Sequence, residues 1–246
     1  MKLDILAIGV HPDDVELGCG GLLLVEKSNQ KKVGIVDLTH GELGTRGTAK
    51  TRNEEAAEAA EAAKILALDT RENLGFADGF FKNDEEHQRN VISIIRKYQP
   101  EIVICNAPED RHPDHGRAGE LVETAAFLSG LIKIETKAGS VKQKPWRPKY
   151  VFHYIQDRFL EPDIIIDITP YMEKKLEAVR AYKTQFLASD EKDGPQTYIS
   201  TPDFLDSIVY RAKMLGKMIG VPYAEGFLSK KKVGIKNMDA IILKNT

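Results

Sequence analysis

The sequence lacks several features that would assign it to familiar classes of protein. It has only two cysteines, Cys19 and Cys105, in 246 residues, too few for a cysteine-rich metal site or a disulfide framework. No apolar run approaches the roughly 20 residues of a membrane-spanning helix, and the first apolar run is too short for a secretory signal. We therefore expect a cytoplasmic protein with no membrane partner.

An excess of charge of one sign is also missing. The 35 Lys and Arg residues nearly balance 37 Asp and Glu residues, and the net charge is −2. Nucleic-acid binding needs a concentrated basic face, so we expect no nucleic-acid partner. The Gly-rich segment 39–47 lacks the Gly-Lys-Ser/Thr ending of a P-loop, and the turn 10–18 lacks Gly-x-Gly-x-x-Gly. These absences argue against nucleotide hydrolysis and against a dinucleotide-dependent oxidoreductase.

Strand-like and helix-like segments alternate along the chain. Apolar runs predict strands at 3–10, 32–38, 71–76, 102–105, 149–155 and 164–168, and the tail 226–235 either adds a last strand or packs across the domain. Apolar spacing predicts helices at 17–25, 51–68, 84–98, 117–128, 171–182 and 202–219. With no repeat or linker, we expect a single domain over 1–246. Its expected fold is a three-layer, Rossmann-like α/β fold with a mostly parallel sheet and helices on both faces.

Histidine and aspartate gather in two turns that follow predicted strands. His-Pro-Asp-Asp (residues 11–14) follows the first strand, and His-Pro-Asp-His (residues 112–115) follows the fourth. In the doubly wound strand order 3-2-1-4-5 the first and fourth strands are neighbours at the switch point, where ligands bind. The two turns are therefore expected to meet.

The residue types in these turns suit a catalytic metal. His11 and Asp14 stand three apart, so on a first helical turn both can reach one point; Asp13 lies about 100° around that turn. Two imidazoles and one carboxylate are the usual protein ligands of a catalytic zinc, with a water molecule in the open position. Binding to the metal lowers the pKa of that water to about 7. We expect the third ligand to come from 112–115.

In these two motifs the chain resembles the LmbE-like, PIG-L-type zinc N-acetylglucosaminyl deacetylases. Further matches are 39–44, the Arg52-x-Glu54 helix start and 74–79, and the resemblance covers nearly the whole chain. Within the family it is most similar to the bacillithiol-pathway deacetylases, which remove acetate from N-acetylglucosaminyl malate. The resemblance implies a metal-dependent amidohydrolase with one Zn²⁺ per chain, Fe²⁺ being a compatible alternative. It also implies a small N-acetylglucosaminide substrate and a homo-oligomer, with hexamers common among relatives.

The resemblance further implies roles for individual side chains. These are zinc ligands at His11, Asp14 and His115; a general base at Asp13; His112 to stabilise the oxyanion or protonate the leaving amine; Asp114 to orient His112; and substrate contacts at Arg52, Asp78 and Tyr198. Tyr198 lies in the polar segment 185–201, expected to be a mobile loop. Asp78 has an equal interpretation as a turn residue, and Arg52 has one as a partner of Glu55 on its own helix.

Two other functions remain open on the sequence. A deacetylase of another N-acetyl sugar, such as a chitooligosaccharide or a mycothiol precursor, would keep the metal site and change its rim. A Rossmann-like binding module with a structural metal would close that site with a fourth protein ligand. Arg46, Arg52 and Arg111 lie in or beside the expected active-site loops, which favours a substrate that carries carboxylates.

Overall fold

The computed structural model describes residues 1–44, 51–186 and 198–243, and for 51–55, 200 and 202 it describes the backbone alone. Arg46 and most of the expected mobile loop, 187–197, therefore lie outside the described residues. Arg52 is described only as backbone within a helix.

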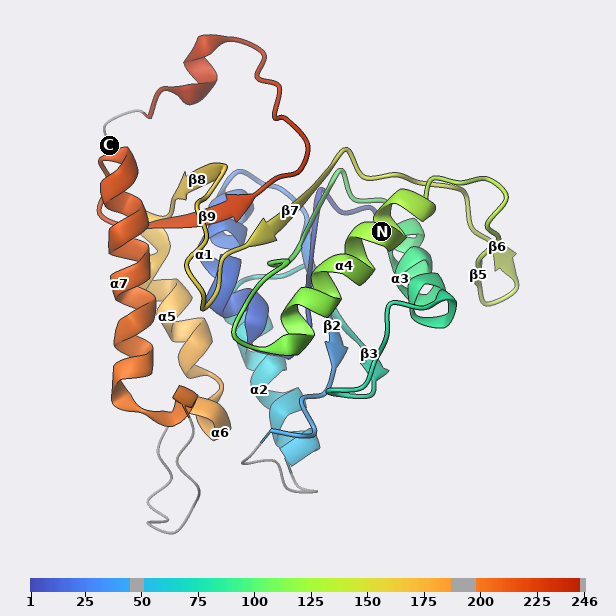
Figure 1. The fold of residues 1–246 in the computed structure, drawn as a ribbon, viewed down its shortest axis with the longest axis horizontal. Coiled ribbons are helices and arrows are strands. Elements are labelled where there is room, and N and C mark those ends of the chain that lie inside the picture. Colours follow the sequence, from blue (N-terminus) through green and yellow to red (C-terminus); the bar gives the residue numbers. More distant parts are fainter. Residues whose placement is uncertain (45–50, 187–197, 244–246) are drawn as a thin grey trace.

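A seven-stranded sheet in the order β3-β2-β1-β4-β7-β9-β8 forms the centre of the molecule (Figure 1). Its strands are β1 (Ile5–Gly9), β2 (Val33–Thr39), β3 (Thr70–Phe76), β4 (Ile102–Asn106), β7 (Tyr150–Tyr154), β8 (Ile164–Asp167) and β9 (Ala224–Leu228). Neighbours from β3 to β7 pair in parallel, whereas β9 is antiparallel to both β7 and β8. A separate two-stranded ribbon consists of β5 (Lys137–Ala138) and β6 (Val141–Lys142).

Helices cover both faces of the sheet, which confirms the three-layer α/β fold (Figure 1). They are α1 (Asp14–Ser28), α2 (Thr51–Ile65), α3 (Glu85–Tyr98), α4 (Pro113–Leu128), α5 (Met172–Arg180), α6 (Lys183–Phe186) and α7 (Pro202–Ile219), with short 3₁₀ turns η1 (Thr169–Tyr171), η2 (Tyr198–Ser200) and η3 (Met238–Ile241). No helix within the described ranges is both long and apolar enough to cross a membrane.

The strand sequences are apolar on both faces because both faces are covered. Along β1, Leu6 and Ile8 pack with the core beneath α3 and α4, and Ile5 and Ala7 pack with the core beneath α1. The helices α3 and α4 contribute their own apolar faces to the first core. The fully buried β1 thus fixes where its C-terminal turn emerges.

The strand order brings the two His/Asp turns together. Strands β1 and β4 pair in parallel with Ile8 opposite Cys105, so their C-terminal ends lie at the same edge of the sheet. The expected adjacency of the first and fourth strands is confirmed. The start of α4 differs from the expectation: the helix begins at Pro113 and not near 117, because His112 caps it and proline suits its first turn.

Helix α1 is kinked at Cys19, whose φ of −147° is not helical. The backbone N–H groups of Gly21 and Leu22 donate to the carboxylate of Glu225 at 2.9 and 2.7 Å, so β9 caps the second half of α1. Glu225 is itself paired with the buried Lys175 at 2.6 Å. The kink is thus held by a buried ion pair from distant parts of the chain.

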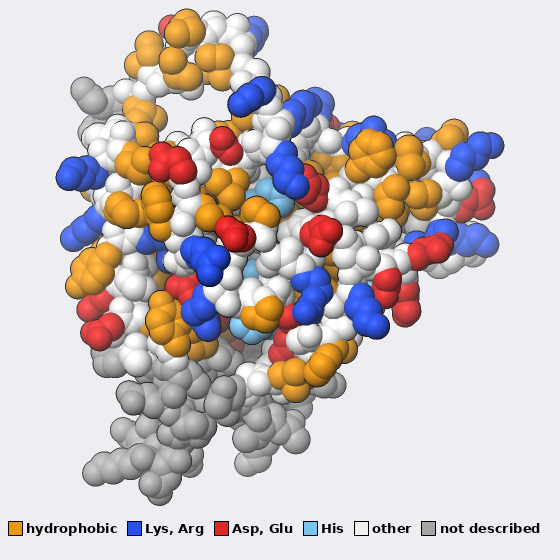
Figure 2. Space-filling view, in the orientation of Figure 1, with side chains coloured by type: hydrophobic (Ala, Val, Ile, Leu, Met, Phe, Trp, Pro, Cys, Tyr) orange, Lys and Arg blue, Asp and Glu red, His pale blue; other side chains and the backbone are white. Residues whose placement is uncertain are grey.

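The C-terminal segment after β9 extends away from the sheet (Figure 1). Figure 2 shows hydrophobic side chains gathered on it at the top of the view. The large exposed apolar residues in the described part of this segment are Val233, Ile235, Met238, Ile241, Ile242 and Leu243.

Candidate metal centre and active site

A pocket of about 370 Å³ opens where the β1–α1 and β4–α4 turns meet. Both turns contribute to its walls, together with residues near 41–44 and 78–79, the loop after β7, and the segment that leads into α7. Figure 2 shows histidine side chains in this face of the molecule, flanked by charged side chains of both signs. The volume of the pocket suits a small-molecule substrate.

Asp14 is the centre of the site. Its Oδ2 accepts hydrogen bonds from the backbone N–H groups of Val10 and His11 at 3.1 and 3.0 Å and from Asn106 Nδ2 at 3.2 Å, and its Oδ1 accepts from Gln156 Nε2 at 2.7 Å. Burial acts to raise the pKa of Asp14, but the adjacent histidines hold it well below its ordinary value. The carboxylate is therefore ionised and fixed in position.

Two imidazole nitrogens point at this carboxylate. His115 Nε2 lies 3.2 Å from Asp14 Oδ1, and His11 Nδ1 lies 3.5 Å from Asp14 Oδ2. The other nitrogen of each ring is held by a carboxylate: His115 Nδ1 by Asp110 at 2.7 Å and His11 Nε2 by Asp78 at 3.0 Å. Such partners fix the tautomer and leave the inward nitrogen free to bind a metal.

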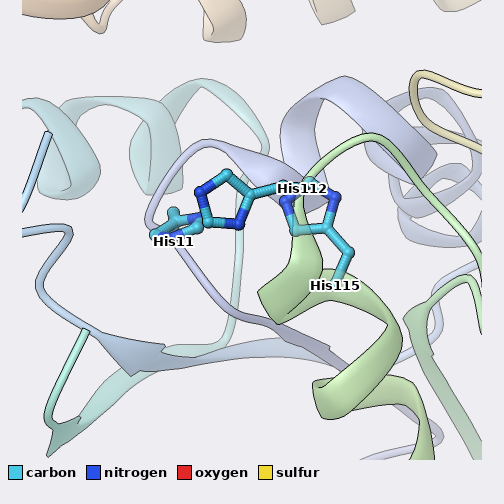
Figure 3. Close-up of side chains that lie close together, drawn as sticks. All are labelled: His11, His112 and His115. Carbon is cyan, nitrogen blue, oxygen red and sulfur yellow. The ribbon is translucent and has the colours of Figure 1, made fainter. Parts of the chain in front are cut away.

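The donor set fits a divalent metal. Two imidazoles and one carboxylate are ligands that zinc accepts in proteins, and here His11 Nδ1 lies 3.5 Å from Asp14 Oδ2 while His115 Nε2 lies 3.2 Å from Asp14 Oδ1. Nitrogens of His11, His112 and His115 also lie within 4.8 Å of one another, and Figure 3 shows the three rings grouped between the β1–α1 turn and the start of α4. His112 is thus close enough to act beside the metal or as a ligand.

His112 is held by the beginning of its own helix. Its Nδ1 accepts the backbone N–H of Asp114 at 3.3 Å, which places the proton of the neutral ring on Nε2. Burial and the neighbouring histidines lower the pKa of His112. The ring is therefore suited to donate a hydrogen bond from Nε2 while it remains neutral.

Asp114 makes different contacts from those expected. The resemblance implies that its carboxylate orients His112, but one oxygen accepts the backbone N–H of Gly79 and the other accepts an N–H of Arg117 Nη1, each at 2.8 Å. The contact with His112 comes from the backbone of Asp114 instead. The carboxylate of Asp114 therefore links the turn 77–79 to α4 by hydrogen bonds.

Asp13 lines the pocket immediately before α1. Its side chain makes no capping hydrogen bond to the helix, so the carboxylate stays available to a substrate or water. Burial, followed by the negative charge of Asp14, raises the pKa of Asp13 to about 7. These properties suit a general base.

The turn between His11 and Asp13 is fixed through the carbonyl oxygen of Pro12. That oxygen accepts hydrogen bonds from Arg71 and from the hydroxyl of Tyr182. Arg71 is anchored in turn by both oxygens of Asp37 at 2.8 Å and by Glu16 at 2.6 Å. A buried ionic cluster thus supports the turn from behind.

The three residues expected to contact the sugar, Asp78, Tyr198 and Arg52, differ in where the structure places them. Asp78 lines the pocket but is buried, with one oxygen 3.0 Å from His11 Nε2 and the other accepting the backbone N–H of Leu43 at 3.0 Å; its contact with the substrate stays a prediction. Tyr198 is exposed at the pocket, where its hydroxyl donates to Asp157 at 3.0 Å and Arg111 lies 4.7 Å from its ring centroid. The side chain of Arg52 lies outside the described part of the chain.

Three residues that contact His115 or Asp14 were not expected from the sequence, namely Asp110, Asn106 and Gln156. The contact of Asp110 could have been predicted from the sequence, because Asp110 lies only five residues before His115 in the same turn. The contacts of Asn106 and Gln156 could not have been predicted, since a single amide side chain at the end of a strand occurs in many proteins without a functional role. Their contacts with Asp14 arise only when β4 and β7 pair beside β1.

Comparisons with known proteins agree with the motifs. The sequence model of the PIG-L family, described as GlcNAc-PI de-N-acetylase, matches residues 6–126. A diacetylchitobiose deacetylase of Thermococcus kodakarensis is 30% identical over 90% of this chain and 81% of its own length. A probable N-acetyl-alpha-D-glucosaminyl L-malate deacetylase 2 of Bacillus subtilis is 27% identical over 75% of this chain and 84% of its own length.

Among solved structures, a conserved protein of Thermus thermophilus superposes with a TM-score of 0.82 and is 34% identical, covering 95% of this chain and 97% of that one. The family model and the two named deacetylases confirm the family suggested by the two His/Asp motifs. The chain belongs to the PIG-L (LmbE-like) family of metal-dependent deacetylases and is a hydrolytic N-deacetylase.

Proposed function

We propose that this enzyme uses zinc to remove the acetyl group from an N-acetylglucosaminide, and that its substrate is N-acetylglucosaminyl malate in bacillithiol biosynthesis. The observation that carries the deacetylase proposal is the convergence of His11, His115 and Asp14, with Asp13 on the wall of the same pocket. The Bacillus subtilis relative, named for a malate substrate, supports the finer assignment.

His11, Asp14 and His115 are the residues that would hold the metal. When bound there, zinc supplies a Lewis acid that polarises the acetamide carbonyl and lowers the pKa of water. Asp78 and Asp110 keep both rings turned toward Asp14. With three protein ligands the proposed site keeps a position open, as catalytic zinc sites do and structural ones do not.

Asp13 and His112 would move and stabilise charge during hydrolysis. Asp13 takes a proton from the attacking water and returns it to the nitrogen as the C–N bond breaks, which releases acetate and the free amine. His112 donates its Nε2 proton as a hydrogen bond to the acetyl oxygen, where negative charge develops. Because His112 Nδ1 already accepts a backbone N–H, a doubly protonated ring is disfavoured, and we assign the proton transfer to Asp13.

A deacetylase of diacetylchitobiose is the second candidate. The Thermococcus kodakarensis relative carries that name and is 30% identical to this chain. Both candidates share the metal site and differ in the charge of the group attached to the sugar. The side chains at the pocket rim therefore decide between them.

A mass-spectrometric assay of the zinc-loaded protein against a panel of N-acetylglucosaminides tests the proposal. We expect loss of an acetyl group from N-acetylglucosaminyl malate at a higher kcat/KM than from diacetylchitobiose. Treatment with a chelator should abolish turnover, and added zinc should restore it. A clear preference for diacetylchitobiose would assign the enzyme to the second candidate.

Two further expectations from the sequence remain proposals. The homo-oligomer, a hexamer by resemblance, is tested by sedimentation velocity on the purified chain. The cytoplasmic location is tested by cell fractionation.

A further inference from the structure

Arg211 is a basic residue in the pocket without a fixed partner among the residues that the structure describes. It lies on α7 and lines the same pocket as His11 and Asp13. Its guanidinium group has no hydrogen bond or ion pair with any residue in the described ranges. Arg111, which also lines the pocket, is by contrast bound to Asp157 at 2.6 Å.

The acidic side chains close to Arg211 already bind other groups. Asp157 accepts Arg111 and the hydroxyl of Tyr198, and Asp110 accepts His115 Nδ1. These carboxylates act on Arg211 through space, but their oxygens are bound elsewhere.

The third nearby carboxylate, that of Glu225, also binds other groups. It pairs with Lys175 and caps the second half of α1 through two backbone N–H groups. Within the described part of the chain, Arg211 therefore has neighbours of opposite charge but none that holds its guanidinium group.

Arg211 is half-buried on the pocket wall, so water solvates its guanidinium group only in part. Burial lowers the pKa of Arg211, and the surrounding carboxylates only partly offset the loss of water. Arginine nevertheless stays charged, because its ordinary pKa lies above 12. Its planar donors match the two oxygens of a carboxylate or phosphate. A ligand with such a group would supply the missing partner.

We propose that Arg211 determines substrate specificity by binding an anionic group, a carboxylate or a phosphate, on the aglycone of the N-acetylglucosaminide. The inference rests on the proposed deacetylase function and adds to it the residue that selects charged substrates. The acetamide must lie at the β1–α1 turn, near Asp13. The sugar and its aglycone then extend toward the remaining walls of the pocket, where Arg211 lies with Tyr198 and Asp157.

The variants Arg211→Met and Arg211→Lys test this assignment, with Lys217→Met as the matched control. Lys217 is an exposed cation on the same helix and does not line the pocket. The substrates are N-acetylglucosaminyl malate, N-acetylglucosamine 1-phosphate and the neutral methyl N-acetylglucosaminide. Together they separate a carboxylate from a phosphate and both from no charge.

We expect Arg211→Met to lower kcat/KM for the preferred anionic substrate by roughly 10- to 150-fold, the value of a charge-assisted hydrogen bond. The loss should lie mainly in KM, and Arg211→Lys should recover part of it. Methyl N-acetylglucosaminide should be hydrolysed by all variants within about threefold of the wild type. The anionic substrate with the larger loss identifies the group that Arg211 binds.

An equal loss on charged and neutral substrates would overturn the inference, because it would mean a structural role. If the wild type hydrolyses none of the three, the proposed function fails, and the anion site is then tested alone. Isothermal titration of L-malate and of inorganic phosphate into the wild type and Arg211→Met decides that case. Weaker binding by the variant supports the inference, and equal affinity for both anions overturns it.

Discussion

Asp110 holds His115 by its outer nitrogen: Asp110 Oδ2 lies 2.7 Å from His115 Nδ1, while His115 Nε2 lies 3.2 Å from Asp14. The acid and the histidine belong to one turn, and the second contact crosses from the β4–α4 turn to the β1–α1 turn. Asp110 therefore orients the ring of His115 toward Asp14 at the junction of two strands, where we propose that the metal binds.

Removing this support should weaken the metal site without unfolding the protein. We expect Asp110→Asn to lower zinc affinity by roughly 10- to 100-fold, the usual effect of a lost partner behind a metal ligand. Competition with a chromophoric chelator measures the affinity. Glu109→Gln is the control, because Glu109 is an exposed neighbour whose ion pair with Arg158 is long, at 3.5 Å. Equal zinc affinity in Asp110→Asn and the wild type would contradict the proposed orientation.

The two adjacent aspartates should respond differently to the same change. Asp13→Asn should keep its zinc and lose turnover by roughly 10²- to 10⁴-fold, the contribution of a positioned general base. Asp14→Asn should lose zinc, with activity partly restored by excess metal, because its carboxylate lies between both histidines.

Metal content by elemental analysis and turnover, measured on both variants in one buffer, decide the assignment. Loss of metal in Asp13→Asn together with retention in Asp14→Asn would exchange the two roles. Full turnover in Asp13→Asn would place the base elsewhere.

His112→Ala separates an oxyanion donor from a metal ligand. As a donor, its removal should lower kcat by about 10²- to 10³-fold and leave the zinc content unchanged. The alternative is that His112 itself binds the metal, since its ring nitrogen lies within 4.8 Å of those of His11 and His115. In that case zinc would be lost in parallel with activity, and the ligand set would need revision.

The buried pair Lys175–Glu225 should contribute strongly to stability. Glu225→Gln leaves the Lys175 ammonium unpaired among buried residues and weakens the cap on α1. We expect the free energy of unfolding to fall by about 3–5 kcal/mol, measured by urea denaturation.

The double variant Lys175→Met with Glu225→Gln serves as the control. Because the uncompensated charge is then gone, it should recover part of the lost stability. A double variant less stable than Glu225→Gln alone would show that the hydrogen bond from Lys175 Nζ to the carbonyl oxygen of Leu17, at 2.9 Å, matters more than the unpaired charge.

Much of the fold was accessible from the sequence. Continuous apolar runs predicted the buried strands, and the alternation with helices predicted the three-layer arrangement, because a parallel sheet covered on both faces leaves that pattern. The meeting of residues 11–14 with 112–115 also followed, since it depends on strand order alone and not on side-chain detail.

The sequence by itself determined that two turns carry histidine and aspartate side chains suited to bind a metal. It also determined that both turns lie at the same edge of the sheet. Only the tertiary structure decided that Asp78 supports His11, that the carboxylate of Asp114 binds Gly79 and Arg117, and that Gln156 reaches Asp14 across 142 positions of sequence. It also left Arg211 in the pocket without a partner among the described residues. Periodicity reports which face of an element is buried, whereas a hydrogen bond between distant segments depends on how those elements pack, and that packing leaves no local pattern.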